Sequence, residues 1–210
     1  MQVRLIASLN RHEPVAVAEQ VAQIAADRQA QGLVGLDLAG DEVNFSAEPF
    51  RGVFQAARQA GLGCVAHAGE WTGALAVRDA IEHLGVQRVG HGVRVVDDPA
   101  VAALARERGI AFEVCLTSNL QSGVVDTLAA HPLPAMNALR LRTTLNTDDP
   151  AVSSISLTDE YQNAVAALGL TLADLKHSLL TAAAASLLPP AEQAALVAQF
   201  RAALDLAAAQ

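Results

Sequence analysis

Short apolar runs alternate with helical segments from one end of this chain to the other, and few folds accommodate that order. Several of the runs are apolar at consecutive positions, as expected for strands that are covered on both faces. The alternation predicts an α/β fold with a parallel sheet. The predicted strands are Val3–Leu9, Leu33–Leu38, Leu62–His67, Val86–His91, Ile110–Cys115 and Leu141–Asn146.

Capping residues mark where the predicted helices begin. Asp98 followed by Pro99 is an N-cap with proline at the first helical position, and Thr171 with Asp174 forms a capping pair. We find no linker and no second compositional region, so we predict one domain over residues 1–210. After the sixth strand the sequence predicts only helices, at 155–168, 171–187 and 190–208.

Composition narrows the class of protein. The chain has 210 residues and a net charge of −8, which argues against a nucleic-acid partner. No apolar run is long enough to cross a bilayer, and a strand at Val3–Leu9 leaves no room for a signal peptide. Cys64 and Cys115 lie in apolar runs without metal-binding spacing, so we expect reduced core thiols in a cytoplasmic protein.

Polar side chains stand at or near the ends of four predicted strands, as Asp37, His67, His91 and Asp148. A parallel barrel gathers such residues at one mouth, whereas an open doubly wound sheet places its ligand at a single switch point. The distribution favours the barrel. Since a closed barrel needs eight strands and about 250 residues, six strands predict an N-terminally incomplete (β/α)8 TIM-barrel fold followed by C-terminal helices.

Five segments resemble the motifs of the adenosine deaminase family in both order and spacing. They are Asp37–Glu42, His67–Glu70, Arg88–Val93, Cys115–Asn119 and Asn146–Pro150. The resemblance implies a zinc-dependent barrel that hydrolyses the 6-amino group of a purine nucleoside. It begins near the family's third strand, and nothing near the N-terminus of this sequence matches the His-x-His metal pair of the family's first strand.

The resemblance implies a role for each of four residues. His67 and Asp148 match zinc ligands, and nitrogen and carboxylate oxygen are ligands that zinc prefers. Glu70 matches the acid that protonates the purine N1, which lets the ring accept electrons during attack at C6. His91 matches the imidazole that orients and deprotonates the attacking water.

Two further roles come with alternatives. By the resemblance Asp149 hydrogen-bonds the purine N7 and the water, and the backbone N–H of Gly40 contacts N3, where a missing side chain permits close approach. Asp148 and Asp149 could instead cap the turn before Pro150. His91 could simply fill a barrel layer. However, two adjacent carboxylates after a buried strand are costly unless a cation pairs with them.

Other polar residues receive structural interpretations. Asp41 and Glu42 read as a loop with one structural ion pair, and Thr117–Asn119 as a segment that satisfies backbone groups. We expect His12 in a surface turn near the mouth, and His131 in a structural turn before proline. None of these histidines is predicted to replace the missing metal pair.

Two functions from different classes remain open. The first is zinc-dependent deamination of adenosine, with deamination of a modified adenosine such as 6-aminofutalosine as a close alternative. The second is a truncated or degenerate deaminase without catalysis, whose exposed sheet edges would favour self-association. An in-frame His-x-His segment encoded upstream of Met1 would decide for the enzyme.

Overall fold

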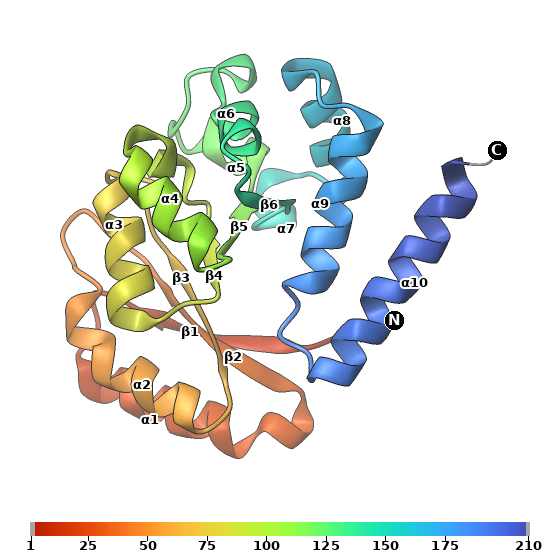
Figure 1. The fold of residues 1–210 in the computed structure, drawn as a ribbon. Coiled ribbons are helices and arrows are strands. Elements are labelled where there is room, and N and C mark those ends of the chain that lie inside the picture. Colours follow the sequence, from red (N-terminus) through yellow and green to blue (C-terminus); the bar gives the residue numbers. More distant parts are fainter. Residues whose placement is uncertain (1–2, 209–210) are drawn as a thin grey trace. The chain divides into compact units, whose positions relative to one another are not determined.

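The computed structural model describes residues 3–208, so the outermost residues of the predicted 1–210 domain lie outside the described part (Figure 1). The chain divides into two compact units, between Ile110 and Ala111. We describe each unit by itself, and the single-domain interpretation stays a prediction. Four parallel strands lie in the first unit and two in the second, which confirms the α/β class with six parallel strands.

The first unit is built on a parallel sheet with the strand order β1-β2-β3-β4. Asp37 of β2 lies opposite Val65 of β3, and His67 at the end of β3 lies opposite Gly90 at the end of β4. This register brings the carboxyl ends of neighbouring strands side by side. The strands are β1 (Leu5–Asn10), β2 (Leu33–Ala39), β3 (Gly63–His67) and β4 (Arg88–Gly90).

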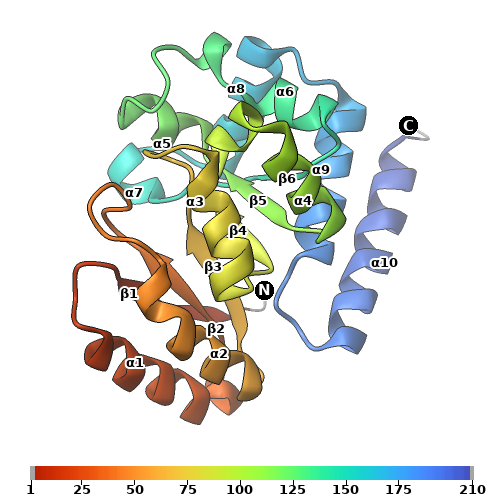
Figure 2. The ribbon, with the colours of Figure 1, turned by 60° about the vertical axis from the view of Figure 1, so that its left-hand side comes forward.

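Helices separate the strands of this unit, and α1 and α2 run beside the β1–β3 strands in both views (Figures 1 and 2). The carboxylate of Asp98 accepts the N–H groups of Ala100 and Val101, which confirms the predicted cap of α4. The helices are α1 (Val15–Asp27), α2 (Arg51–Gln59), α3 (Ala74–Asp79) and α4 (Pro99–Glu107), with short helical turns at Gln29–Gln31, Glu48–Phe50, Ala80–Leu84 and Val93–Asp97.

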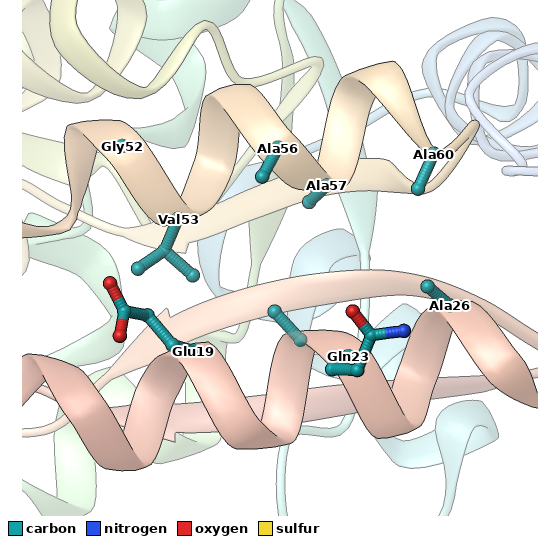
Figure 3. Close-up of a pocket in the computed structure, with 9 residues that line it drawn as sticks. Glu19, Gln23, Ala26, Gly52, Val53, Ala56, Ala57 and Ala60 are labelled. Atoms are coloured by element: carbon teal, nitrogen blue, oxygen red, sulfur yellow. The ribbon is translucent and has the colours of Figure 1, made fainter.

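A groove of about 240 Å³ separates α1 from α2 (Figure 3). Alanines from both helices line it, among them Ala26 and Ala56, and Glu19 and Gln23 add polar atoms on the α1 side. Small side chains allow two helices to approach closely. None of the residues to which the sequence gives chemistry lies in this groove, so we interpret it as a feature of helix packing.

The second unit pairs two parallel strands and adds most of its helices after them. The N–H of Leu145 in β6 donates to the hydroxyl of Ser178 in α9 (3.1 Å), and Lys176 of α9 donates to the carbonyl of Leu204 in α10 (2.8 Å). Its elements are β5 (Ala111–Val114), α5 (Leu116–Gln121), a turn at Leu128–Ala130, α6 (Leu133–Ala138), β6 (Arg142–Leu145), α7 (Pro150–Ser153), α8 (Leu157–Leu168), α9 (Leu172–Ala184) and α10 (Pro190–Ala208).

The predicted C-terminal helices are confirmed, with small shifts at their ends. Thr171 and Asp174 form a reciprocal capping box, in which the Asp174 carboxylate accepts the Thr171 N–H at 2.8 Å. The third of the predicted helix ranges, 190–208, coincides with α10. Within the described residues, no helix combines the length and apolarity needed to cross a membrane.

Both cysteines are free and buried, as predicted. Burial raises the pKa of the Cys64 thiol to about 11. Because the thiolate is the reactive form, we expect Cys64 to carry about 100-fold less thiolate near pH 8 than an ordinary thiol, and to react correspondingly slowly. Labelling by a thiol-specific reagent with peptide mapping checks this, and the same chain in denaturant is the control. Equal rates in the two conditions would contradict the burial.

Candidate active site

His67 is held at the end of β3 by a carboxylate from the neighbouring strand. Its Nδ1 lies 3.1 Å from Asp37 Oδ1, and its ring rests against Gly90, where an added Cβ would come within 3.1 Å of the ring. Histidine ligands of metals usually use their second ring nitrogen in this way, which fixes the ring and its tautomer. The donor set therefore suits a metal-binding histidine that coordinates through Nε2.

Glu70 and His91 lie together in the same unit, with His91 buried and Glu70 largely covered. Glu70 Oε2 lies 3.5 Å from His91 Nε2, and only 12% and 3% of their side chains are exposed. The ring centres of His91 and His67 are 5.3 Å apart. Three predicted site residues from two neighbouring strand ends thus lie together.

The loop that carries Glu70 is held by Glu42, to which the sequence assigns no role in the site. The buried carboxylate of Glu42 accepts the N–H groups of Gly69 and Glu70, each at 2.8 Å, and of Thr72 at 2.9 Å, and it also accepts the N–H of Trp71. The sequence predicts a loop with one structural ion pair at Asp41 and Glu42. In the structure the Glu42 carboxylate binds backbone N–H groups, and its charge also acts on the buried Arg11. No motif in the sequence indicates this contact, because Glu42 and the loop that it binds are 27 to 30 residues apart.

Arg11 is buried behind the same loop. Its guanidinium donates to the carbonyl of His67, and to the carbonyl of Phe45 at 3.3 Å. Burial lowers the pKa of Arg11, while the negative charges of Glu42 and Asp37 act in the opposite direction. Backbone groups at both ends of the segment from His67 to Thr72 are therefore held by side chains from other parts of the unit.

Gly40 follows β2 with a backbone φ of +94°, which disfavours any residue with a side chain. A Cβ at this position would also come within 2.4 Å of Asn10 Oδ1. The position therefore has no room for a side chain, and the contact of its N–H with the purine N3 stays a prediction.

We expect Gly40→Ala to destabilise the chain by about 1–2 kcal/mol, because alanine must adopt a left-handed conformation there. Gly52 is the matched control, since it lies in α2 and a Cβ there meets nothing within 4 Å. Gly52→Ala should stabilise the chain slightly, by about 0.5–1 kcal/mol. Urea unfolding of the two variants measures both. A Gly40→Ala chain as stable as the parent would remove the argument for glycine.

Asp148 and Asp149 follow β6 in the second unit, and both are exposed. The hydroxyl of Ser118 donates to Asp148 Oδ2 at 2.8 Å. The side chain of Asp149 makes no capping hydrogen bond at the start of α7, although its carbonyl accepts the N–H of Val152 at 3.0 Å. The turn-capping alternative is therefore wrong for the Asp149 side chain.

Backbone strain coincides with two of the predicted site residues. Among the described residues, four that are not glycine have a positive φ, and His91 and Asp148 are two of them, each at 56°. Residues other than glycine rarely adopt this conformation, and when they do they cluster at functional sites. Arg140 and Ser154, to which the sequence assigns no role, have the same conformation, at 57° and 54°. The functional roles of His91 and Asp148 stay predictions.

The second unit repeats the use of a buried carboxylate. Glu160 of α8 is fully buried, and it accepts the N–H groups of Leu116 (2.7 Å) and Thr117 (3.1 Å) at the start of α5. His131 is buried and bonded to Asn119 Oδ1 at 3.1 Å. The structural interpretation of His131 is confirmed. The role of Glu160 was not predicted from the sequence.

His12 lies in an exposed turn after β1, as expected. It also lines an open cavity of about 480 Å³, together with Arg11 and Phe45, and its ring centre is 6.3 Å from that of Phe45. The candidate site residues of the first unit therefore lie at or just after the carboxyl ends of its strands.

Known proteins match nearly the whole of this chain. An adenosine deaminase family model matches residues 1–203. The adenosine deaminase of Klebsiella pneumoniae subsp. pneumoniae is 39% identical over 198 residues, which cover 94% of this chain and 59% of that protein. The adenosine deaminase of Erwinia tasmaniensis is 42% identical over 81% of this chain and 52% of its own length.

Solved structures with the same fold include deaminases. The adenine deaminase of Arthrobacter aurescens has a TM-score of 0.87 at 29% identity and covers 96% of this chain and 62% of its own. An amidohydrolase from Burkholderia ambifaria, with bound zinc, has a TM-score of 0.90 at 31% identity over 98% of this chain and 57% of its own. The chain thus spans between half and two thirds of each of these proteins. With a family match over nearly its whole length, the chain belongs to the adenosine deaminase family.

Proposed function

We propose that this chain, together with a segment carrying the family's His-x-His pair, hydrolyses adenosine to inosine and ammonia. A C6–O bond forms with water, and the C6–N6 bond breaks. The observation that carries the proposal is the Glu70–His91 pair beside His67, in a chain of the adenosine deaminase family. It supplies a proton donor and a proton acceptor at one strand-end cluster.

The proposed metal is zinc, with His67 and Asp148 as the ligands from this chain. The support is chemical, since imidazole nitrogen and carboxylate oxygen suit zinc, and the Asp37 contact orients His67 as such a ligand. When bound, zinc would act as a Lewis acid and lower the pKa of a water molecule to near neutrality. A zinc-bound relative of the same fold is consistent with this choice.

The residues of the chain move the protons and hold the base. Glu70 gives its proton to N1 of the purine while His91 takes the proton released by the attacking water. His91 then passes the proton that it took from water to the departing amino group, which leaves as ammonia. Glu70 regains a proton from the C6 hydroxyl as the C6=O bond forms. Asp149 and the N–H of Gly40 are proposed to bind N7 and N3, which orients C6 toward the water.

A substrate panel tests the proposed choice of adenosine. The protein to use is a zinc-loaded chimera in which an N-terminal segment that carries the family's His-x-His pair, taken from an adenosine deaminase such as the Klebsiella relative, precedes this chain. We expect adenosine to be the best substrate by kcat/KM. Adenine and N6-methyl-AMP belong in the panel, because structural relatives are named for them, and 6-aminofutalosine tests the modified-adenosine alternative. A higher kcat/KM for any of these three would replace adenosine as the proposed substrate.

A further inference from the structure

We infer that Glu42 is a positioning residue that sets the place of the Glu70 carboxyl by binding the backbone of the loop Gly69–Thr72. The expected effect on catalysis rests on the proposed function. The expected effect on the loop rests only on contacts within the first unit. Glu42 itself is not proposed to touch the substrate. It acts through the backbone from which Glu70 projects.

The contacts are unusually dense for one side chain. Glu42 Oε2 accepts the N–H of Gly69 at 2.8 Å, and Oε1 accepts those of Glu70 at 2.8 Å and Thr72 at 2.9 Å. The N–H of Trp71 also donates to Oε1. Hydrogen bonds to a charged group are roughly twice as strong as neutral ones, so four of them confine all the amides of this loop.

Burying the charged Glu42 side chain costs free energy, which indicates that its contacts with the loop are a specific structural feature. Only 8% of this residue is exposed, and a buried charge is costly unless it is fully hydrogen-bonded. Four consecutive N–H groups converge on its two oxygens, one on Oε2 and three on Oε1, and the buried charge of Arg11 also acts on it. That geometry fixes the direction in which the side chain of Glu70 leaves the loop.

The other end of the segment is fixed independently. Arg11 donates to the carbonyl of His67, and His67 is held by Asp37. Gly69 has a φ of +68°, and a Cβ there would come within 2.5 Å of Val77 Cγ2, so the turn has little freedom. Glu42 supplies the missing restraint on the side that carries Glu70, and leaves the Glu70 carboxyl 3.5 Å from His91.

Hydrogen exchange on the 210-residue chain tests the structural part, without any need for activity. In Glu42→Gln the amide group presents its own N–H donors to the loop, so we expect the amides of Gly69–Thr72 to exchange about tenfold faster or more. The strand amides of β2 and β3 should keep their rates, which shows that the variant is folded. Unchanged exchange at Gly69–Thr72 would overturn the inference.

Asp41→Asn is the matched control. Asp41 is the exposed neighbour of Glu42, and its carboxylate accepts the N–H groups of Val43 and Asn44 and the side-chain amide of Asn44. Asparagine preserves such a turn. The exchange rates of Gly69–Thr72 should therefore match the parent chain. Faster exchange in this control as well would mean that the loop responds to any change nearby, and would overturn the specific role of Glu42.

A double-mutant cycle in the zinc-loaded chimera tests the positioning part. Glu42→Gln should lower kcat about 10–100-fold with little change in KM, since small misplacements of a catalytic group cost this much. In a Glu70→Gln background the same change should have almost no further effect, because the group that it positions is gone. Equal losses in both backgrounds would indicate a general structural role and refute the inference. A folded, zinc-loaded chimera without any deaminase activity would instead refute the proposed function, and with it the kinetic part of this inference. The hydrogen-exchange result would still decide whether Glu42 holds the loop Gly69–Thr72.

Discussion

Glu70→Gln in the zinc-loaded chimera is expected to lower the turnover of adenosine about 10²–10⁴-fold, the usual contribution of a general acid or base. Glutamine keeps the size of the side chain and its ability to hydrogen-bond His91, which lies 3.5 Å from Glu70. It has no proton to give to the purine N1. Bound zinc should stay at the parent level, because Glu70 is not a proposed ligand.

Steady-state kinetics and zinc content measured on the same preparation check this result. Glu82→Gln is the matched control, since Glu82 lies at an exposed ion pair with Arg78 in the first unit. It should leave turnover unchanged. Near-normal turnover in Glu70→Gln would contradict the assignment of Glu70 as the acid.

The second large effect is expected at Asp148. Asp148→Ala should lose both zinc and activity, because it removes a proposed ligand, and His67→Ala should do the same. Asp149→Asn is the informative comparison, since Asp149 is proposed to bind substrate and not metal. It should lose activity while keeping zinc, and metal analysis after dialysis separates the two outcomes. An Asp148→Ala chimera with full zinc would exclude Asp148 as a ligand.

The 210-residue chain alone is expected to bind zinc weakly and to show no turnover above background. It supplies two proposed ligands, His67 and Asp148, whereas catalytic zinc sites usually have three or more protein ligands. Equilibrium dialysis against zinc tests this. Tight, stoichiometric binding by the chain alone would mean that another residue completes the site.

The order of strands and helices could be predicted because it depends on local sequence. Alternating apolar runs and caps such as Asp98 and Thr171 act within a few residues. Among the strands, β4 keeps the smallest share of its predicted residues, since it is predicted as Val86–His91 and observed as Arg88–Gly90. The chain leaves the sheet early because His91 has a left-handed backbone, at φ 56°, and glycine follows it with φ 63°.

The supporting contacts of the site could not be predicted, because they join distant parts of the sequence. Glu42 and the loop that it binds are 27 to 30 residues apart, and Glu160 lies more than 40 residues from the amides that it accepts. Neither pairing leaves a periodic or motif-like signal. Arg11 was missed for the same reason, since it binds the carbonyl of His67 across 56 residues. The motif residues were found because their spacing along the chain is itself the signal.

Turnover of adenosine by the zinc-loaded chimera in oxygen-18 water is the most direct measurement of the proposed chemistry. If the residues of this chain carry out hydrolytic deamination, ammonia and inosine form in equal amounts, and the new oxygen at C6 carries the label from water. Absence of ammonia from a folded, zinc-loaded chimera, or inosine without the label, would contradict it.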